Sequence, residues 1–208
     1  MQDTSGTHEQ GLAKSAVEGD EIIARLRIRD VLINGKLIFV IDNVVVGQQI
    51  HSIYQEIMSL PYHFGELDYK GDEYPISAHE LDTGRSMQVT ALTQTVTMLV
   101  DMQFPDLTHR LDRSYVNQVR YGDMTYPHTD ASRNSKNVTA IFYANEAWNR
   151  QFGGETNFYD FRGENLCAVL PRPGRLVLFH GSIEHNGSPP TRITTIPRYT
   201  VAFKFDSR

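Results

Sequence analysis

The half of the chain that follows residue 112 consists of short apolar runs with two-residue alternation, punctuated by Gly, Pro, Asn and Asp. Such alternation places successive side chains on opposite faces of an extended strand, and turn residues at these intervals are typical of antiparallel sheets. We therefore expect strands at residues 114–121, 137–144, 156–161, 166–170, 175–180 and 199–205.

Two helices are expected before this β region. Apolar residues recur at helical spacing over residues 46–58, where Asp42 or Asn43 could cap the helix, and over residues 92–100, where Ser86 is the candidate cap. Two helices that precede a run of short strands indicate an α+β domain, in which the helices cover one face of a β-sandwich or barrel.

Two other segments of the N-terminal half carry local signals. Asn34-Gly35 separates the β-branched runs 27–33 and 36–41, which predicts a tight β-hairpin. Residues 65–85 are glycine-rich, acidic and without periodicity. We expect them to form a long loop, and loops of that length in compact domains are often functional lids.

Length and charge limit the possible classes. The 208 residues suit one domain, residues 21–208, behind a polar tail at residues 1–20 that is expected to be disordered. Twenty Lys and Arg against twenty-five Asp and Glu give a net charge of -5, which argues against a nucleic-acid partner. No apolar run resembles a signal peptide or a membrane span, so we expect no membrane partner and a cytoplasmic location.

The sequence contains a single cysteine, Cys167. One thiol excludes an internal disulfide framework and any Cys-rich zinc or iron–sulfur site. A metal in this protein would therefore have to be bound by His and carboxylate side chains.

Three residues form a candidate metal site. His128 and Asp130 stand two positions apart, so they project to the same side of an extended chain, and His185 offers a third ligand on the turn after residues 175–180. Two histidines and one carboxylate form the facial arrangement of non-haem Fe(II) sites, which keeps coordination positions open. His180 is the rival third ligand, although its place inside an apolar strand favours a core role.

Arg198 is the candidate anion-binding residue. A 2-oxoacid that chelates iron leaves its far carboxylate in need of a buried cation, for which a bidentate arginine is best suited. Arg198 opens the last apolar strand and shares one face with Thr200 and Ala202, and an inward arginine is costly unless it meets an anion. Arg192, in the loop after Pro189-Pro190, is the alternative.

Several sequence blocks then follow one another in a recognisable order. They are YGDMTYPHTD at 121–130, VTAIFYANEAW at 138–148, GGETNFY at 153–159, GRLVLF at 174–179, His185, and RYTVAF at 198–203. Together these blocks, within residues 114–206, resemble the 2-oxoglutarate/Fe(II) dioxygenase superfamily, specifically its prolyl-4-hydroxylase-like branch.

The resemblance implies a fold and a set of ligands. The fold is a double-stranded β-helix, a cupin-like jelly roll with iron inside its open mouth and the N-terminal helices packed on one sheet. By the same carry-over, His128, Asp130 and His185 would be the iron ligands, and Arg198 would pair with the C5 carboxylate of 2-oxoglutarate. The interval from His185 to Arg198 is a few residues longer than is common in the branch, so Arg192 stays an alternative partner of the C5 carboxylate.

The resemblance also points to two tyrosines. Tyr143 stands where the family often places a phenol that donates to the C5 carboxylate. Tyr121 is a second candidate, closer to the metal pair than the corresponding tyrosine of the family.

The implied cofactors are Fe(II), 2-oxoglutarate and O₂. The implied reaction is hydroxylation of an unactivated C–H bond in an amino acid, a peptidyl residue or a natural-product intermediate, with release of succinate and CO₂. Asp130 favours hydroxylation over halogenation, since related halogenases replace this carboxylate with a small residue. The acidic residues of the 65–85 loop favour a cationic substrate.

Two functions of other classes stay open. A non-catalytic jelly-roll protein would use the metal to bind or sense a ligand. A zinc-dependent hydrolase would use the same three ligands, although no general base is evident for it.

Overall fold

The computed structural model describes residues 20–208 except residue 69. Its elements in chain order are β1 (Arg27–Ile33), β2 (Lys36–Asp42), α2 (Gln48–Met58), β3 (His63–Glu66), β4 (Ile76–Glu80), α3 (Met87–Gln103), β5 (His109–Val119), β6 (Val138–Tyr143), the short 3₁₀ helix η1 (Arg150–Phe152), β7 (Thr156–Tyr159), β8 (Asn165–Val169), β9 (Leu176–His180), β10 (His185–Gly187) and β11 (Arg198–Ser207). The tail expected to be disordered, residues 1–20, lies outside the described residues apart from Asp20.

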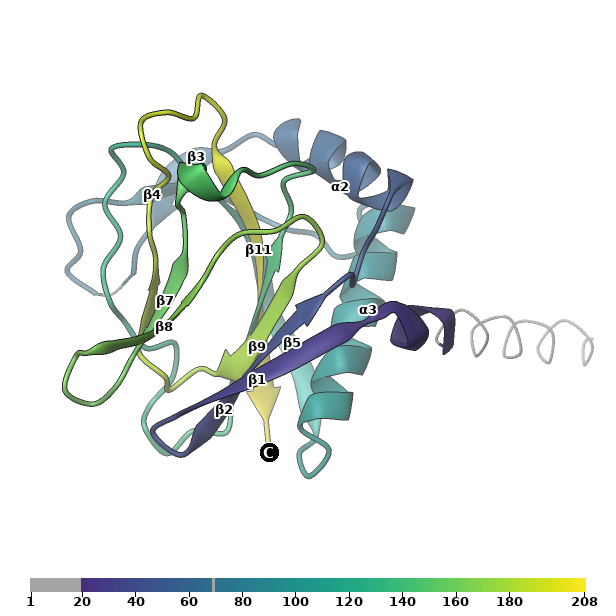
Figure 1. Ribbon diagram of the computed structural model, residues 1–208, viewed down its shortest axis with the longest axis vertical. Coiled ribbons are helices and arrows are strands. Elements are labelled where there is room, and N and C mark those ends of the chain that lie inside the picture. Colours follow the sequence, from purple (N-terminus) through teal and green to yellow (C-terminus); the bar gives the residue numbers. More distant parts are fainter. Residues whose placement is uncertain (1–19, 69) are drawn as a thin grey trace, which may run out of the picture.

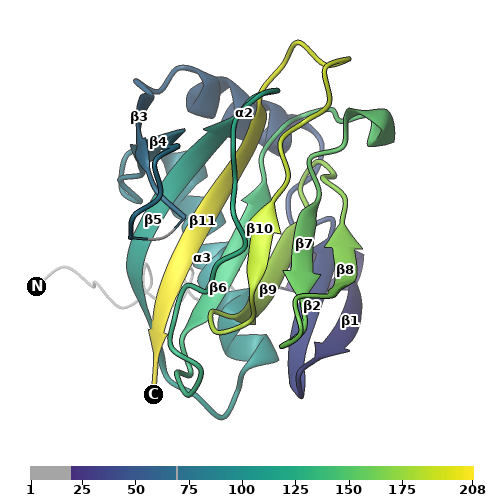
Figure 2. The same cartoon turned by 90° about the vertical axis from the view of Figure 1, so that its left-hand side faces the viewer.

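The strands form two antiparallel sheets. The large sheet has the order β1-β2-β9-β6-β11-β5-β4-β3, and the small sheet has the order β10-β7-β8. Figure 2 shows the small sheet facing the large one, and in Figure 1 helices α2 and α3 lie on the opposite side of the large sheet. This is the expected jelly roll, with the helices covering one face.

Two apolar clusters follow from this layering. The larger one joins α2 and α3 to the outer face of the large sheet, and the smaller one lies between the sheets, with Phe158 of β7 against Phe179 of β9. Strand β11 contributes to both sides because its side chains alternate. Tyr199, Val201 and Phe203 belong to the helix-side cluster, while the residues between them face inward.

The expected hairpin is confirmed in register. β1 pairs with β2 from Arg27 opposite Asp42 to Ile33 opposite Lys36, and the connection is the pair Asn34-Gly35. Both turn residues have positive φ, 54° and 75°, as a two-residue turn that matches strand twist requires.

The helix ends show one confirmed cap and one correction. Ser86 accepts a hydrogen bond from the backbone N–H of Val89 at the start of α3, as expected. The expected side-chain cap of α2 is wrong, because α2 begins after Gly47 without such a bond. Asp42 instead binds Arg175, and the amide of Asn43 donates to the backbone oxygen of Arg25.

The expected loop at residues 65–85 is shorter than predicted. It contains the end of β3 and all of β4, which pair with each other, and β4 also pairs with β5. These strands lack a strong apolar run, and the edge of the large sheet supplies their hydrogen bonds. What remains between them is the segment 67–75, named here the β3–β4 loop.

None of the helices among the described residues is both long and apolar enough to span a membrane.

Candidate metal centre

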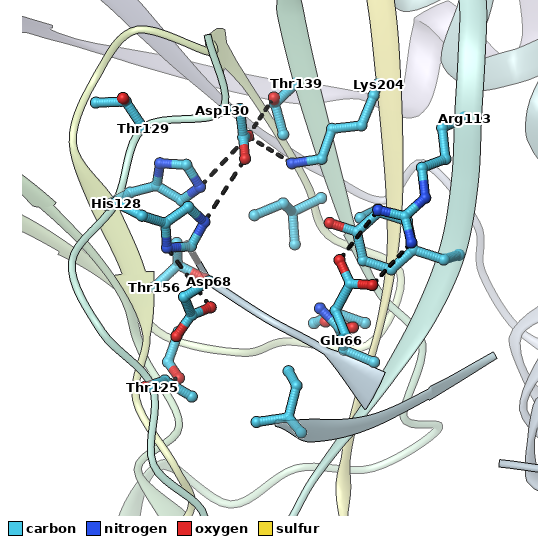
Figure 3. A pocket seen from close by; sticks show the side chains of 18 of the residues that line it. Glu66, Asp68, Arg113, Thr125, His128, Thr129, Asp130, Thr139, Thr156 and Lys204 are labelled. Carbon is cyan, nitrogen blue, oxygen red and sulfur yellow. Dashed lines mark hydrogen bonds and ion pairs between the residues drawn. The ribbon is translucent and has the colours of Figure 1, made fainter. Parts of the chain in front are cut away.

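A cavity of about 370 Å³ opens between the two sheets. The inward residues of β5, β6 and β11 form its wall, while the β3–β4 loop and the segment 125–130 complete its rim (Figure 3). His128, Asp130, His185 and Arg198 all line it.

Main-chain hydrogen bonds hold the segments that carry the three candidate ligands. The backbones of His128 and His185 bond to each other in both directions, at 3.0 and 2.9 Å, and form an isolated antiparallel bridge. The N–H of Asp130 donates to the oxygen of Gly181 at 2.7 Å. The turn that precedes β10 is thus fastened to the segment of the first two ligands.

Both imidazoles point the same nitrogen at Asp130. The Nδ1 of His128 donates to the oxygen of Tyr126, and the Nδ1 of His185 donates to the oxygen of Ile183, each at 2.9 Å. A carbonyl oxygen can only accept, so each Nδ1 carries the proton and each neutral ring keeps a lone pair on Nε2. These Nε2 atoms lie 3.6 and 3.5 Å from the two oxygens of Asp130.

The surroundings keep the carboxylate charged and one imidazole neutral. Burial opposes ionisation of Asp130, but the neighbouring Lys204, His185 and His128 hold the pKa of its carboxyl well below the usual range. Burial lowers the pKa of His185 to about 4, so its ring is neutral at physiological pH. For His128, burial is outweighed by Asp130, the Tyr126 oxygen and Asp68, which raise its pKa.

These donors suit a divalent metal ion. One atom of each residue lies within 4.8 Å of the others. Two nitrogen lone pairs and a carboxylate that converge on one point repel one another unless a cation lies between them. Two imidazoles and one carboxylate are also the ligand set of non-haem Fe(II) oxygenases.

Arg198 lies in the same cavity and lacks a carboxylate partner among the described residues. Arg198 is 3% exposed, its Nη2 donates to the hydroxyl of Thr156 at 3.1 Å, and its Nε has no hydrogen-bond partner within the described part of the chain. Burial lowers the pKa of this group. A buried cation with unused donors fits the distal carboxylate of 2-oxoglutarate.

Comparison with known proteins supports the fold and the enzyme class that the sequence implied. Residues 116–205 match the model of the 2OG-Fe(II) oxygenase superfamily. The matched segment is a 2OG-Fe(II) oxygenase domain. The protein is a 2-oxoglutarate-dependent dioxygenase with iron, 2-oxoglutarate and O₂ as cofactors, as the sequence blocks implied.

Solved structures similar to this oxygenase include prolyl hydroxylases. One from Trichoplax adhaerens, in complex with a hypoxia inducible factor peptide fragment, shares 17% identity at a TM-score of 0.60, over 81% of this chain and 83% of that one. A prolyl-4-hydroxylase from Pseudomonas putida shares 19% identity at a TM-score of 0.59, over 79% and 89%. HygX from Streptomyces hygroscopicus, with nickel and 2-oxoglutarate bound, shares 14% identity at a TM-score of 0.59, over 81% of this chain and 82% of that one. No curated protein sequence matches the chain.

The two candidate tyrosines of this oxygenase lie outside the cavity lining. Tyr121 is 64% exposed, because the turn over residues 120–123 directs it outward. Tyr143 is buried, but its hydroxyl hydrogen-bonds to Thr156 at 2.7 Å and to the oxygen of Val169 at 3.0 Å. Tyr143 nevertheless lies beside Arg198, whose guanidinium carbon is 5.6 Å from the centre of the Tyr143 ring, whereas Tyr121 is directed away from the cavity.

The two rival residues also lie elsewhere. His180 packs its ring against Phe104 at 5.1 Å between centroids and is absent from the ligand cluster. Arg192 is exposed and does not line the cavity.

Three polar neighbours of the ligands were not foreseen. Thr139 and Lys204 both contact Asp130, and Asp68 of the β3–β4 loop accepts the N–H of Tyr126 and lies 3.5 Å from the Nδ1 of His128. Lys204 could have been found, because it continues the inward face of Arg198, Thr200 and Ala202 at the same spacing of two. Asp68 gave no such signal, since its position depends on how a loop folds back.

Proposed function

We propose that this oxygenase hydroxylates an unactivated C–H bond of an amino acid, a peptidyl residue or a natural-product intermediate, and releases succinate and CO₂. His128, Asp130 and His185 would bind the iron, and Arg198 would bind the C5 carboxylate of 2-oxoglutarate. One observation carries the proposal: two Nε2 lone pairs and a carboxylate converge in the same cavity as a buried guanidinium with unused donors.

The protein's own contribution is binding and orientation. Iron with 2-oxoglutarate and O₂ supplies the oxidising chemistry when bound. Arg198 offers donors to the distal carboxylate, and its bond to Thr156 fixes the guanidinium. Each imidazole is held in one tautomer by its own backbone carbonyl, so both Nε2 atoms are ready to bind metal without reorientation.

An anaerobic titration tests the binding part of this proposal. Fe(II) and 2-oxoglutarate added together are expected to give the weak visible charge-transfer band of the chelate, and Fe(II) alone is not. A screen of amino acids, peptides and amine-bearing metabolites for succinate release under air then tests turnover.

A cationic substrate remains our proposal, now on a smaller set of residues. Apart from Asp130 and Arg198, the cavity is lined by four carboxylates, on Glu66, Asp68, Asp112 and Asp206, against two cations. Of the acidic residues of the 65–85 segment, only Glu66 and Asp68 line the cavity. The excess of negative charge favours a substrate that carries an amine or a guanidine.

Asp112 is the best probe of this charge preference, since its side chain is 56% exposed and its nearest cation, on Arg110, is 3.7 Å away. For a cationic substrate, Asp112→Asn is expected to raise KM about threefold at low salt with kcat unchanged, and the difference should shrink at high salt. The exposed Asp106→Asn, away from the cavity, is the control. A lowered KM in D112N would argue for an anionic substrate instead.

The alternative that the sequence left open is a non-catalytic ligand-binding or sensor protein, which the match to an oxygenase family disfavours. It predicts the charge-transfer band without succinate formation on any substrate. Structural relatives leave both peptides and small molecules open as ligands, since one holds a peptide fragment and another holds hygromycin B.

A further inference from the structure

One of the two carboxylate oxygens of Asp130 forms an ion pair with a lysine. The Nζ of Lys204 lies 2.5 Å from Oδ2 of Asp130, and the hydroxyl of Thr139 donates to the same oxygen at 2.6 Å (Figure 3). The side chains of Lys204 and Asp130 are only 21% and 12% exposed. This ion pair therefore lies within the cavity rather than on the surface.

The two oxygens of Asp130 consequently differ. Oδ2 has two donors, one of them charged, and lies 3.5 Å from Nε2 of His185, whereas Oδ1 lies 3.6 Å from Nε2 of His128. Charge-assisted bonds of this length are among the strong ones, and they orient a ligating carboxylate. A carboxylate with one oxygen held in this way has only the other oxygen free to bind metal.

We propose that Lys204 is a positioning residue that, together with Thr139, restricts Asp130 to binding the metal through Oδ1 alone. The inference rests on the proposed function of Asp130 as a metal ligand. Asp130 would then occupy less of the metal's coordination sphere than a carboxylate bound through both oxygens, which would leave room for 2-oxoglutarate.

The placement of Lys204 on β11 supports a specific role. It is the fourth inward residue of that strand after Arg198, Thr200 and Ala202, and it lines the same cavity. Its Nζ is 5.8 Å from the centre of the Tyr115 ring, a second favourable contact for an ammonium group. A half-buried lysine is costly without an anion, and Asp130 is the anion within reach.

Cobalt(II) gives a readout that does not depend on activity. Its visible absorption bands weaken as the coordination number rises, so Co(II) titrations report how Asp130 binds in the absence of 2-oxoglutarate. The test compares the wild type with the variants Lys204→Met, Lys204→Arg and Thr139→Val. Lys136→Met is the matched control, because Lys136 is exposed and does not line the cavity.

Lys204→Met is expected to keep Co(II) affinity within about tenfold of the wild type and to give weaker visible bands, with 2-oxoglutarate binding about tenfold weaker or more. Thr139→Val should weaken the visible bands and 2-oxoglutarate binding in the same direction, but by less. Lys204→Arg should restore part of the wild-type spectrum, since it keeps a cation, and Lys136→Met should match the wild type.

Three outcomes would overturn the inference. An unchanged Co(II) spectrum in Lys204→Met, even with a higher substrate KM, would mean that Lys204 contacts substrate and does not act through Asp130. Metal binding more than tenfold tighter in Lys204→Met would mean that the ammonium occupies the place of the metal. Absence of metal binding by the wild type would reject the proposed function as well, whereas metal binding with no effect of Lys204 would reject this inference alone.

Discussion

The backbones of His128 and His185 are joined by a reciprocal pair of hydrogen bonds, which brings their ring centroids to 4.6 Å. These bonds use only main-chain atoms. The two positions therefore stay together when either imidazole is replaced, and loss of a ligand can be separated from loss of the fold.

Replacing either histidine by glutamine is expected to weaken Fe(II) and Co(II) binding by on the order of 100-fold or more, because one of three ligands is lost. Glutamine keeps much of the ring's volume against Phe158 and Phe179, which contact His185. The melting temperature should change by only a few degrees. Metal titration and circular dichroism measure the two effects.

His180→Gln tests the rival ligand. His180 lies in β9 and packs on Phe104, so its loss should leave metal affinity within about threefold of the wild type. Weakened metal binding in this variant with intact binding in His185→Gln would reverse the assignment.

Arg198→Met is expected to weaken 2-oxoglutarate binding by about 100-fold while metal affinity stays within about threefold, because a buried partner of the distal carboxylate is removed. The same change should not lower the melting temperature of the metal-free protein, since a buried guanidinium without a counter-charge is costly. Calorimetric titration with 2-oxoglutarate checks the first expectation. Arg192→Met, an exposed control, should bind 2-oxoglutarate normally, and a loss there would shift the anchor to Arg192.

Tyr143→Phe separates a supporting tyrosine from a direct ligand. The Tyr143 hydroxyl donates to the Val169 oxygen and bonds to Thr156, which in turn accepts from Arg198. Its removal should lower the free energy of unfolding by about 1–3 kcal/mol, because buried partners lose a hydrogen bond. The effect on 2-oxoglutarate affinity should be less than about fivefold. A loss as large as that of Arg198→Met would restore the direct contact that the sequence predicted.

The parts of the fold that local chemistry determines could be predicted. The alternation of apolar residues located β5 to β9 and β11 within a few residues. Asn34-Gly35 predicted the hairpin because few residue pairs readily adopt positive φ at both turn positions. The candidate ligands His128 and Asp130 were visible because the spacing of two residues in an extended chain determines how they lie relative to each other. His185 was placed by its position on the turn after the strand at 175–180 and by the resemblance, and Arg198 by strand parity and by the resemblance.

What could not be predicted depends on partners far apart in the sequence. β10 is three residues long and exists because it pairs with β7 and bridges to His128. Strands β3 and β4 are added at the edge of a sheet whose other strands form the interior. Tyr121, expected near the site, is directed outward by a turn, and Asp68, not expected near the ligands, is directed inward by a loop. Neither direction could be deduced from the local sequence.

A charge pair whose two residues do not line the cavity gives a test of stability and its pH dependence. Arg175 donates from Nε to Oδ1 of Asp42 at 2.6 Å and from Nη2 to Oδ2 at 3.0 Å, and their side chains are 8% and 15% exposed. Burial acts to raise the pKa of Asp42, but the hydrogen bonds and charge of Arg175 outweigh it and hold that pKa below the usual range. The stabilisation is therefore fully present above the pKa of the unfolded chain, about 4, and is lost as pH falls through the lower pKa of the folded state.

Asp42→Asn should lower the free energy of unfolding by about 2–4 kcal/mol at pH 7, because it leaves a nearly buried guanidinium without its counter-charge. The difference from the wild type should shrink below about pH 4, where the wild-type carboxyl also becomes protonated. Urea denaturation at pH 7 and pH 3 measures both. Asp30→Asn, an exposed residue of β1, should change stability by less than about 0.5 kcal/mol at either pH. A difference of equal size at both pH values would show that Asp42 acts through packing rather than through its charge.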